Sequence, residues 1–137
     1  MNSRLTDTDG DAAIPALDQL QRLASTIRAR TIETSSRSGT PHLGSCLSCI
    51  DILVALYFYI LKIDPANPND PGRDRLILSK GHGAPALFQV LAERGYFPVS
   101  DLDDYGADGG IFAEHPPTPS HLPGIEAATG SLGHGLS

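Results

Sequence analysis

The sequence predicts an α/β fold, of which this chain carries the N-terminal helices and one strand of a mainly parallel sheet. Three observations support this prediction. An amphipathic helical pattern lies near the start, a nearly all-apolar helix follows it, and a short apolar strand leads through glycines into another helix. With 137 residues the chain has the length of one domain, and its 40% hydrophobic residues are enough to form a core.

Charge and apolar pattern argue against several classes of function. The net charge of −6 has no basic patch behind it, which argues against nucleic acid or an anionic membrane as the main partner. The longest apolar stretch, residues 50–61, is shorter than the roughly 18 residues needed to span a bilayer. No signal peptide is visible, and two cysteines cannot form a disulfide framework. We therefore expect a cytoplasmic protein without a membrane partner.

The first helix is expected after a flexible leader. Residues 1–13 are polar and small, which is typical of a frayed terminus, and the remaining 14–137 are expected to form a partial domain. A helix is predicted from about Pro15 to Ser36, because its apolar residues repeat with helical spacing: Leu17, Leu20, Ala24 and Ile27. Two glycines and a proline in residues 37–44 predict a loop after it.

The second helix and the strand are both expected to need neighbours. Residues 48–61 predict a helix that is apolar nearly all round, and such a helix is buried on more than one side. After a proline-rich connector over 64–72, the apolar run 75–79 predicts a buried parallel strand. Because one strand cannot make a sheet, the chain is expected to have a large interface with other segments or chains.

Glycine and proline mark the ends of the third helix. The sequence Gly-His-Gly over 81–83 leads into a predicted helix over 84–94, with Pro85 in its first turn and Gly95 just past its end. Residues 96–128 are mostly irregular, and a long irregular stretch in a compact domain is usually functional. The glycine-rich run 129–137 predicts a loop that enters a helix.

Histidines in loops are the first candidates for chemistry. Glycine beside a histidine lets a ligand approach the backbone, and the strand-to-helix turn at His82 offers free N–H groups that favour a phosphate. Lys80 is either a phosphate contact or a surface charge. Each histidine alone is more simply a hydrogen-bonded polar loop residue. Together, however, the four in glycine- or proline-rich loops favour a binding site: His42, His82, His115 and His134.

A metal site is the second interpretation. Cys46 and Cys49 have C-x₂-C spacing, which together with the histidines raises a small histidine–cysteine metal protein as a hypothesis. No second pair of this kind exists, so buried structural thiols are favoured and no metal ligand is assigned. Three aspartates that follow Ser100 are expected to form a capped, solvated turn: Asp101, Asp103 and Asp104.

Several motifs in order resemble the N-terminal part of transketolase, most closely the split type in which the two halves are separate chains. The resemblance covers about residues 18–137. The two main departures from the family pattern are Glu114, which stands where glycine is usual, and His134, which stands where glutamine is common. The motifs that carry the resemblance are Thr40–Ser48, Asp74–Ala86, His115–Pro116, Pro123–Glu126 and Thr129–Ser137.

The resemblance implies a three-layer thiamine-diphosphate-binding fold with a mainly parallel sheet, in which this chain is the pyrophosphate-binding part. At matching positions, the resemblance implies that His82 contacts the diphosphate. It implies that His42 and His115 are catalytic residues near the thiazolium carbon, which bind ketose hydroxyls and assist proton transfer. It also implies three further cofactor-binding residues, Gly130, Ser131 and Leu132, of which Gly130 and Leu132 match the backbone positions beside the aminopyrimidine.

The resemblance also implies a function that needs partners. The expected enzyme transfers a two-carbon ketol unit from a ketose phosphate to an aldose acceptor. In this family Mg²⁺ is held by a Gly-Asp-Gly motif and an asparagine that lie beyond residue 137, and an activating glutamate lies on the other domain. Other transketolase subunits are therefore expected to supply the metal motif and the pyrimidine-binding domain, and the chain alone is expected to be inactive.

Other functions stay open at this point. The chain is alternatively a non-catalytic truncated remnant, or a regulatory subunit that binds a partner but no cofactor. Other enzymes with the same cofactor, such as 1-deoxyxylulose-5-phosphate synthase or pyruvate dehydrogenase components, also fit part of the pattern. The run Ser79–Ala86 favours transketolase among them.

Overall fold

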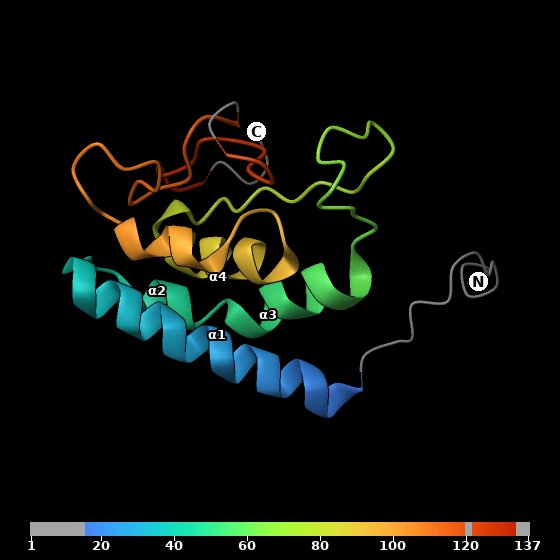
Figure 1. The fold of residues 1–137 in the computed structure, drawn as a ribbon, viewed down its shortest axis with the longest axis horizontal. Helices are drawn as coiled ribbons and strands as arrows, with labels where there is room; N and C mark the ends of the chain where they lie inside the picture. Colours follow the sequence, from blue (N-terminus) through green and yellow to red (C-terminus); the bar gives the residue numbers. More distant parts are fainter. Residues whose placement is uncertain (1–15, 120–121, 134–137) are drawn as a thin grey trace.

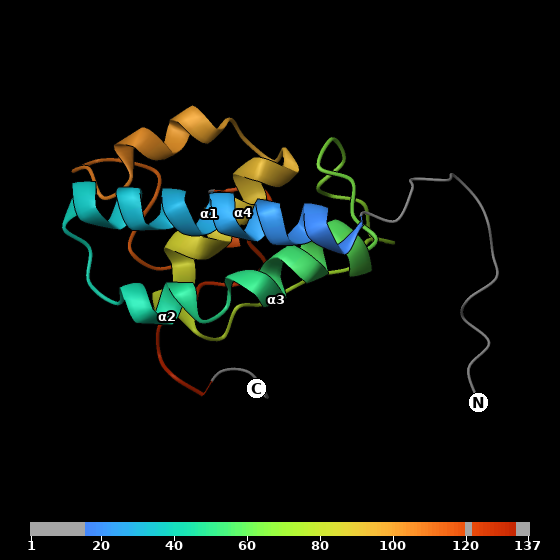
Figure 2. The ribbon, with the colours of Figure 1, turned by 90° about the horizontal axis from the view of Figure 1, so that it is seen from below.

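Four α-helices form the body of the molecule. The structure, a computed structural model, describes residues 16–119 and 122–133. Helix α1 packs against the three other helices, and residues 112–119 and 122–133 lie on the side of α4 opposite α1 (Figures 1 and 2). A π-helical turn and two 3₁₀ turns complete the described elements. In chain order these are α1 (Leu17–Ser38), α2 (Leu43–Leu47), α3 (Ile50–Ala55), the π turn η1 (Leu56–Ile60), the 3₁₀ turn η2 (Gly81–Gly83), α4 (Ala84–Arg94) and the 3₁₀ turn η3 (Val99–Asp104).

Helix α1 confirms the amphipathic pattern with shifted ends. Its inner side buries Ala24 and Ile27, as predicted, whereas Leu17 at the first turn is 71% exposed. The helix continues two residues beyond the predicted end and stops because Gly39 adopts a left-handed backbone, with φ of 69°. The predicted loop over 37–44 is therefore shorter, because α2 already begins at Leu43.

The prediction of one helix over 48–61 was wrong in its bounds. The chain turns at Ser48 and Cys49, and the helical region beyond is split between α3 and the π turn η1. One side of this region is buried against α1 and α4. The other side leaves three large apolar residues between 56% and 62% exposed: Ile52, Tyr59 and Ile60. This exposed side is where the expected interface would lie.

The same region passes a simple test for a membrane span. By length and composition alone, the 18 residues Leu43–Ile60 could cross a bilayer, with a mean hydropathy of 1.9. Core helices of soluble proteins meet the same criteria. Here the stretch is broken between α2 and α3, and Ile50, Leu53 and Val54 pack inside the molecule. It is therefore weak evidence for a membrane-spanning segment.

The predicted strand 75–79 is not observed as a strand. The described part of the chain contains no β-strand, and residues 74–78 have no regular secondary structure. A strand requires a paired neighbour, and Ile77 is 58% exposed where a sheet would cover it. The sheet of the predicted α/β fold is thus not seen in residues 16–119 and 122–133.

Helix α4 is the centre of the core and has the predicted bounds. All residues from Ala84 to Ala92 are buried, and Gly95 ends the helix in a left-handed conformation. Phe88 packs its ring 5.5 Å from that of Phe112 and 6.1 Å from that of Tyr105, measured between centroids. These aromatic contacts hold the irregular segment after η3 against α4.

The described residues of 96–128 contain no α-helix or β-strand and are mostly irregular, as predicted, with 3₁₀ geometry in η3 and at Pro119. The predicted cap by Ser100 was wrong, because η3 begins at Val99 after Pro98 and shows no side-chain cap. Asp103 and Asp104 are exposed, and Asp103 lies 3.3 Å from the guanidinium of Arg37. The aspartates thus form a solvated turn.

Candidate functional site

Three histidines from three separate loops converge. The imidazole of His82 contacts those of His42 and His115, with centroid distances of 4.6 Å in both pairs and edge-to-face angles of 75° and 81°. All three were predicted as site residues. The structure brings them together, although up to 73 positions separate them in the sequence. Such a cluster offers several hydrogen-bonding nitrogens to one ligand.

His42 sits in a strained backbone conformation at the start of α2. Its φ of 71° is the only positive φ of a non-glycine residue in the described ranges. A left-handed residue with a Cβ costs about 1 kcal/mol or more. The amides of Ser45 and Cys46 donate to the His42 carbonyl at 2.9 and 3.3 Å and hold this turn. Strain of this kind is common where a side chain must be aimed at a ligand.

His82 lies in η2, the turn directly before α4. The buried thiol of Cys46 donates to the His82 carbonyl at 3.6 Å. Burial raises the pKa of this thiol, which keeps it protonated and able to donate. Lys80, two residues earlier, donates to the hydroxyl of Ser48 at 2.8 Å. The lysine is thus tied to Ser48 at the end of α2.

The cysteines behave as structural thiols. Cys46 and Cys49 are both free and buried, and burial raises the pKa of each. Across residues 16–119 and 122–133, no group of three or more histidine, cysteine or acidic side chains is arranged to hold a metal ion. The hypothesis of a small histidine–cysteine metal protein therefore gains no support from the described residues.

The glycine-rich segment after residue 128 packs directly on this cluster. A Cβ on Gly81 would lie 2.6 Å from the carbonyl carbon and oxygen of Thr129, so the two backbones approach as closely as glycine allows. A Cβ on Gly130 would lie 3.2 Å from Cδ2 of His115. The predicted cofactor-binding positions thus begin at the histidine cluster, with Ser131 and Leu132 exposed beyond it.

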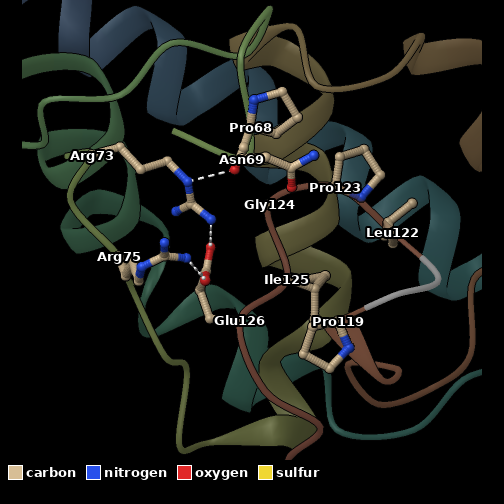
Figure 3. Close-up of a pocket in the computed structure, with 10 residues that line it drawn as sticks. All are labelled: Pro68, Asn69, Arg73, Arg75, Pro119, Leu122, Pro123, Gly124, Ile125 and Glu126. Atoms are coloured by element: carbon tan, nitrogen blue, oxygen red, sulfur yellow. Dashed lines mark hydrogen bonds and ion pairs between the residues drawn. The ribbon is translucent and has the colours of Figure 1, made fainter. Parts of the chain in front are cut away.

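An ion-pair cluster lines a separate cavity of about 360 Å³ (Figure 3). Arg73 and Arg75 both point at the carboxylate of Glu126, with N–O distances of 2.5 and 2.9 Å. None of these three residues was predicted as a site residue. Arg75 and Glu126 lie within the motifs Asp74–Ala86 and Pro123–Glu126, whereas Arg73 lies just before the first of them.

Of the two departures from the family pattern, the structure describes Glu114 but not His134. Glu114, which precedes His115, is exposed to solvent. The side chain of His134 and the rest of the predicted helix entry over 134–137 lie outside the described residues.

The arrangement suits an anionic ligand that carries reacting oxygens. The cluster stands at the amino end of α4, where the helix dipole favours negative charge. Imidazoles exchange protons near neutral pH, so they serve as both hydrogen-bond partners and acid–base groups. A phosphate-bearing ligand with hydroxyl or carbonyl groups fits this chemistry.

Comparison with known proteins identifies similar sequences. A family model described as "Transketolase, thiamine diphosphate binding domain" matches residues 19–137. The 6-deoxy-6-sulfo-D-fructose transketolase subunit SqwG of Clostridium sp. (strain MSTE9) is 48% identical over 118 residues, which are 86% of this chain and 42% of that protein. An apulose-4-phosphate transketolase subunit of Phocaeicola vulgatus is 41% identical over 110 residues, 80% of this chain and 38% of that protein. The chain thus spans about two fifths of the length of these relatives.

Solved structures share the fold of the described residues. Transketolase from Campylobacter jejuni superposes with a TM-score of 0.79 at 32% identity, covering 89% of this chain and 19% of that protein. Transketolase from Leishmania mexicana gives the same TM-score at 25% identity, covering 90% of this chain and 18% of that protein.

Proposed function

Since the chain belongs to the transketolase family, we propose that it forms the part of a thiamine-diphosphate-dependent transketolase that holds the diphosphate end of the cofactor. The proposed reaction transfers a two-carbon ketol unit from a ketose phosphate to an aldose acceptor. The observation that carries the proposal is the convergence of His42, His82 and His115 at the amino end of α4.

The described residues fit the diphosphate and thiazolium end of the cofactor. Gly81 leaves no room for a Cβ against the backbone of Thr129 and Gly130, and a Cβ on Gly130 would crowd the ring of His115. His82 and the amino end of α4 would hold the diphosphate, and the backbone of 130–132 would lie beside the aminopyrimidine. The hard Mg²⁺ ion prefers oxygen ligands, so we propose that its ligands lie outside the described residues.

The histidines would provide the chemistry around the reacting carbon. Thiamine diphosphate supplies the carbanion chemistry when bound. His42 and His115 would bind the hydroxyls of the ketose and carry protons to and from oxygens whose charge changes during the reaction. The strained backbone of His42 supports this role, because it fixes the direction of an otherwise exposed side chain.

The partners of the chain are also part of the proposal. Two relatives are named as subunits, and this chain spans less than half of each. We propose that further transketolase segments or subunits supply the metal ligands and the pyrimidine-binding domain in a cytoplasmic assembly. The exposed apolar side of α3 and η1, formed by Ile52, Tyr59 and Ile60, supports such an interface. The substrate is proposed as a sugar phosphate.

Replacing His82 by alanine tests the cofactor site. In the complete assembly, His82→Ala removes a diphosphate contact and is expected to weaken binding of thiamine diphosphate by roughly 10- to 100-fold. Isothermal titration calorimetry with thiamine diphosphate and Mg²⁺ measures the change. The matched control is Arg22→Ala, which breaks the exposed Asp18–Arg22 pair on α1 and is expected to leave affinity unchanged.

The same titration separates the two candidate functions. Unchanged affinity in His82→Ala would remove this histidine from the cofactor site. No binding by the unmodified assembly would instead favour the alternative of a non-catalytic remnant or regulatory subunit.

A further inference from the structure

Residues 73–81 and 126–130 are far apart in the sequence but run side by side, and they contact each other at three successive points. At the first point, Arg73 and Arg75 bind the carboxylate of Glu126. At the second, the hydroxyl of Thr129 donates to the carbonyl of Leu78 at 2.8 Å. At the third, the backbone of Gly81 meets that of Thr129 and Gly130. The contacts advance in the same direction along both segments, so they fix the register of 126–130 against 73–81.

We propose that Glu126 is a positioning residue for the cofactor loop, defined here as residues 129–133. Its carboxylate, held by two arginines, sets where this loop lies relative to His82 and His115. The inference rests on the proposed function, because the loop and the histidines are the proposed cofactor site. Glu126 itself lines the cavity of Figure 3, which none of the three histidines lines.

The burial of the ion pair makes Glu126 a stiff anchor. Only 8% of the Arg73 side chain and 10% of the Glu126 side chain are exposed, so the pair is weakly screened by water. Each carboxylate oxygen binds a different guanidinium, which fixes the carboxylate in orientation as well as in position. The Nε of Arg73 also donates to the carbonyl of Pro68 at 2.6 Å. Arg75 is half-exposed and contributes less.

Glu126 lies close in sequence to the proposed site. Only the small residues Ala127 and Ala128 separate Glu126 from Thr129, so a shift of the anchor reaches the loop directly. Gly130 packs on the ring of His115, and Thr129 packs on Gly81 beside His82. A loss of register at Glu126 would therefore disturb both histidine contacts. The Thr129–Leu78 hydrogen bond is too weak to hold the loop alone.

The test compares two ion pairs in the complete assembly. Glu126→Gln keeps the shape of the side chain but removes its charge, and Glu93→Gln does the same to the part-buried Arg30–Glu93 pair between α1 and α4. Hydrogen exchange measures how fast the backbone amides of 129–133 exchange with solvent. Calorimetry measures the affinity for thiamine diphosphate in the presence of Mg²⁺. We expect Glu126→Gln to speed exchange in 129–133 and to weaken cofactor binding about tenfold or more, as loss of outer-sphere support does in other sites. Glu93→Gln is expected to lower the melting temperature without either effect.

Each outcome decides a specific point. Unchanged cofactor affinity and unchanged exchange in Glu126→Gln would overturn the inference, as would equal effects from Glu93→Gln. If Glu126→Gln fails to fold, Glu126→Asp keeps the charge and is expected to restore folding and part of the affinity. The inference would also be overturned if a folded Glu126→Asp or Glu126→Gln variant showed faster exchange of the 129–133 amides but bound thiamine diphosphate with normal affinity. Absence of binding by the unmodified assembly contradicts the proposed function, whereas the exchange data still test the register.

Discussion

Replacing Gly81 with alanine is expected to displace the loop 129–133 and to weaken thiamine diphosphate binding by about 10- to 100-fold. The new Cβ would stand 2.6 Å from the carbonyl carbon and oxygen of Thr129 and 2.7 Å from the amide nitrogen of Gly130. These are backbone atoms, so no side-chain rotation relieves the overlap and one of the two segments must move. Because His82 follows Gly81 directly, the movement falls on the proposed diphosphate contact. Calorimetry with the cofactor and Mg²⁺ measures it in the complete assembly.

Gly44→Ala is the matched control for this substitution. A Cβ on Gly44 meets no atom within 4 Å, and the residue lies inside α2 with an ordinary helical backbone. Alanine is favoured over glycine in a helix by roughly 0.5–1 kcal/mol, so the melting temperature is expected to stay level or rise. If Gly81→Ala binds the cofactor as tightly as Gly44→Ala does, the close approach at Gly81 has no part in forming the site.

Phe88→Ala is expected to cause the largest loss of stability, about 3–5 kcal/mol in the free energy of unfolding. Phe88 is fully buried in the middle of α4 and packs on the rings of Tyr105 and Phe112. Aromatic pairs contribute about 0.5–1.5 kcal/mol each beyond the area that they bury. The cavity left by the ring would loosen the segment that leads to His115.

Chemical denaturation of the assembly, followed by circular dichroism, measures the loss in Phe88→Ala. Leu17→Ala serves as the control, because Leu17 is 71% exposed and its truncation is expected to change stability by no more than about 0.5 kcal/mol. A loss in Phe88→Ala as small as that of the control would show that α4 is not the centre of the core.

The parts of the fold that the sequence predicts best are those with local signals. Helix α4 has the predicted bounds because Gly83, Pro85 and Gly95 mark its ends within the chain itself. The break at Ser48 and Cys49 has no such marker, and apolar residues on all sides hide the change of direction. The strand over 75–79 depends on a neighbouring strand, which no local pattern supplies.

The sequence predicted the three histidines that the structure brings together, but not the ion pairs of Glu126. Glycines and prolines beside His42, His82 and His115 indicated ligand-binding loops, and the structure brings the three rings together. Their roles toward cofactor and substrate stay predictions. The carboxylate of Glu126 and the guanidinium of Arg75 are paired across 51 positions, a separation at which spacing carries no information.

Alkylation of the Cys46 thiol offers a way to measure local opening at the site. The thiol has no exposed surface and donates to the carbonyl of His82, so an alkylating reagent can reach it only when α2 and the turn around His82 move apart. Its labelling rate therefore reports how often this local opening occurs, as amide exchange reports local unfolding. Because a ligand held by His82 would keep the turn shut, slower alkylation would register occupancy without any measurement of turnover.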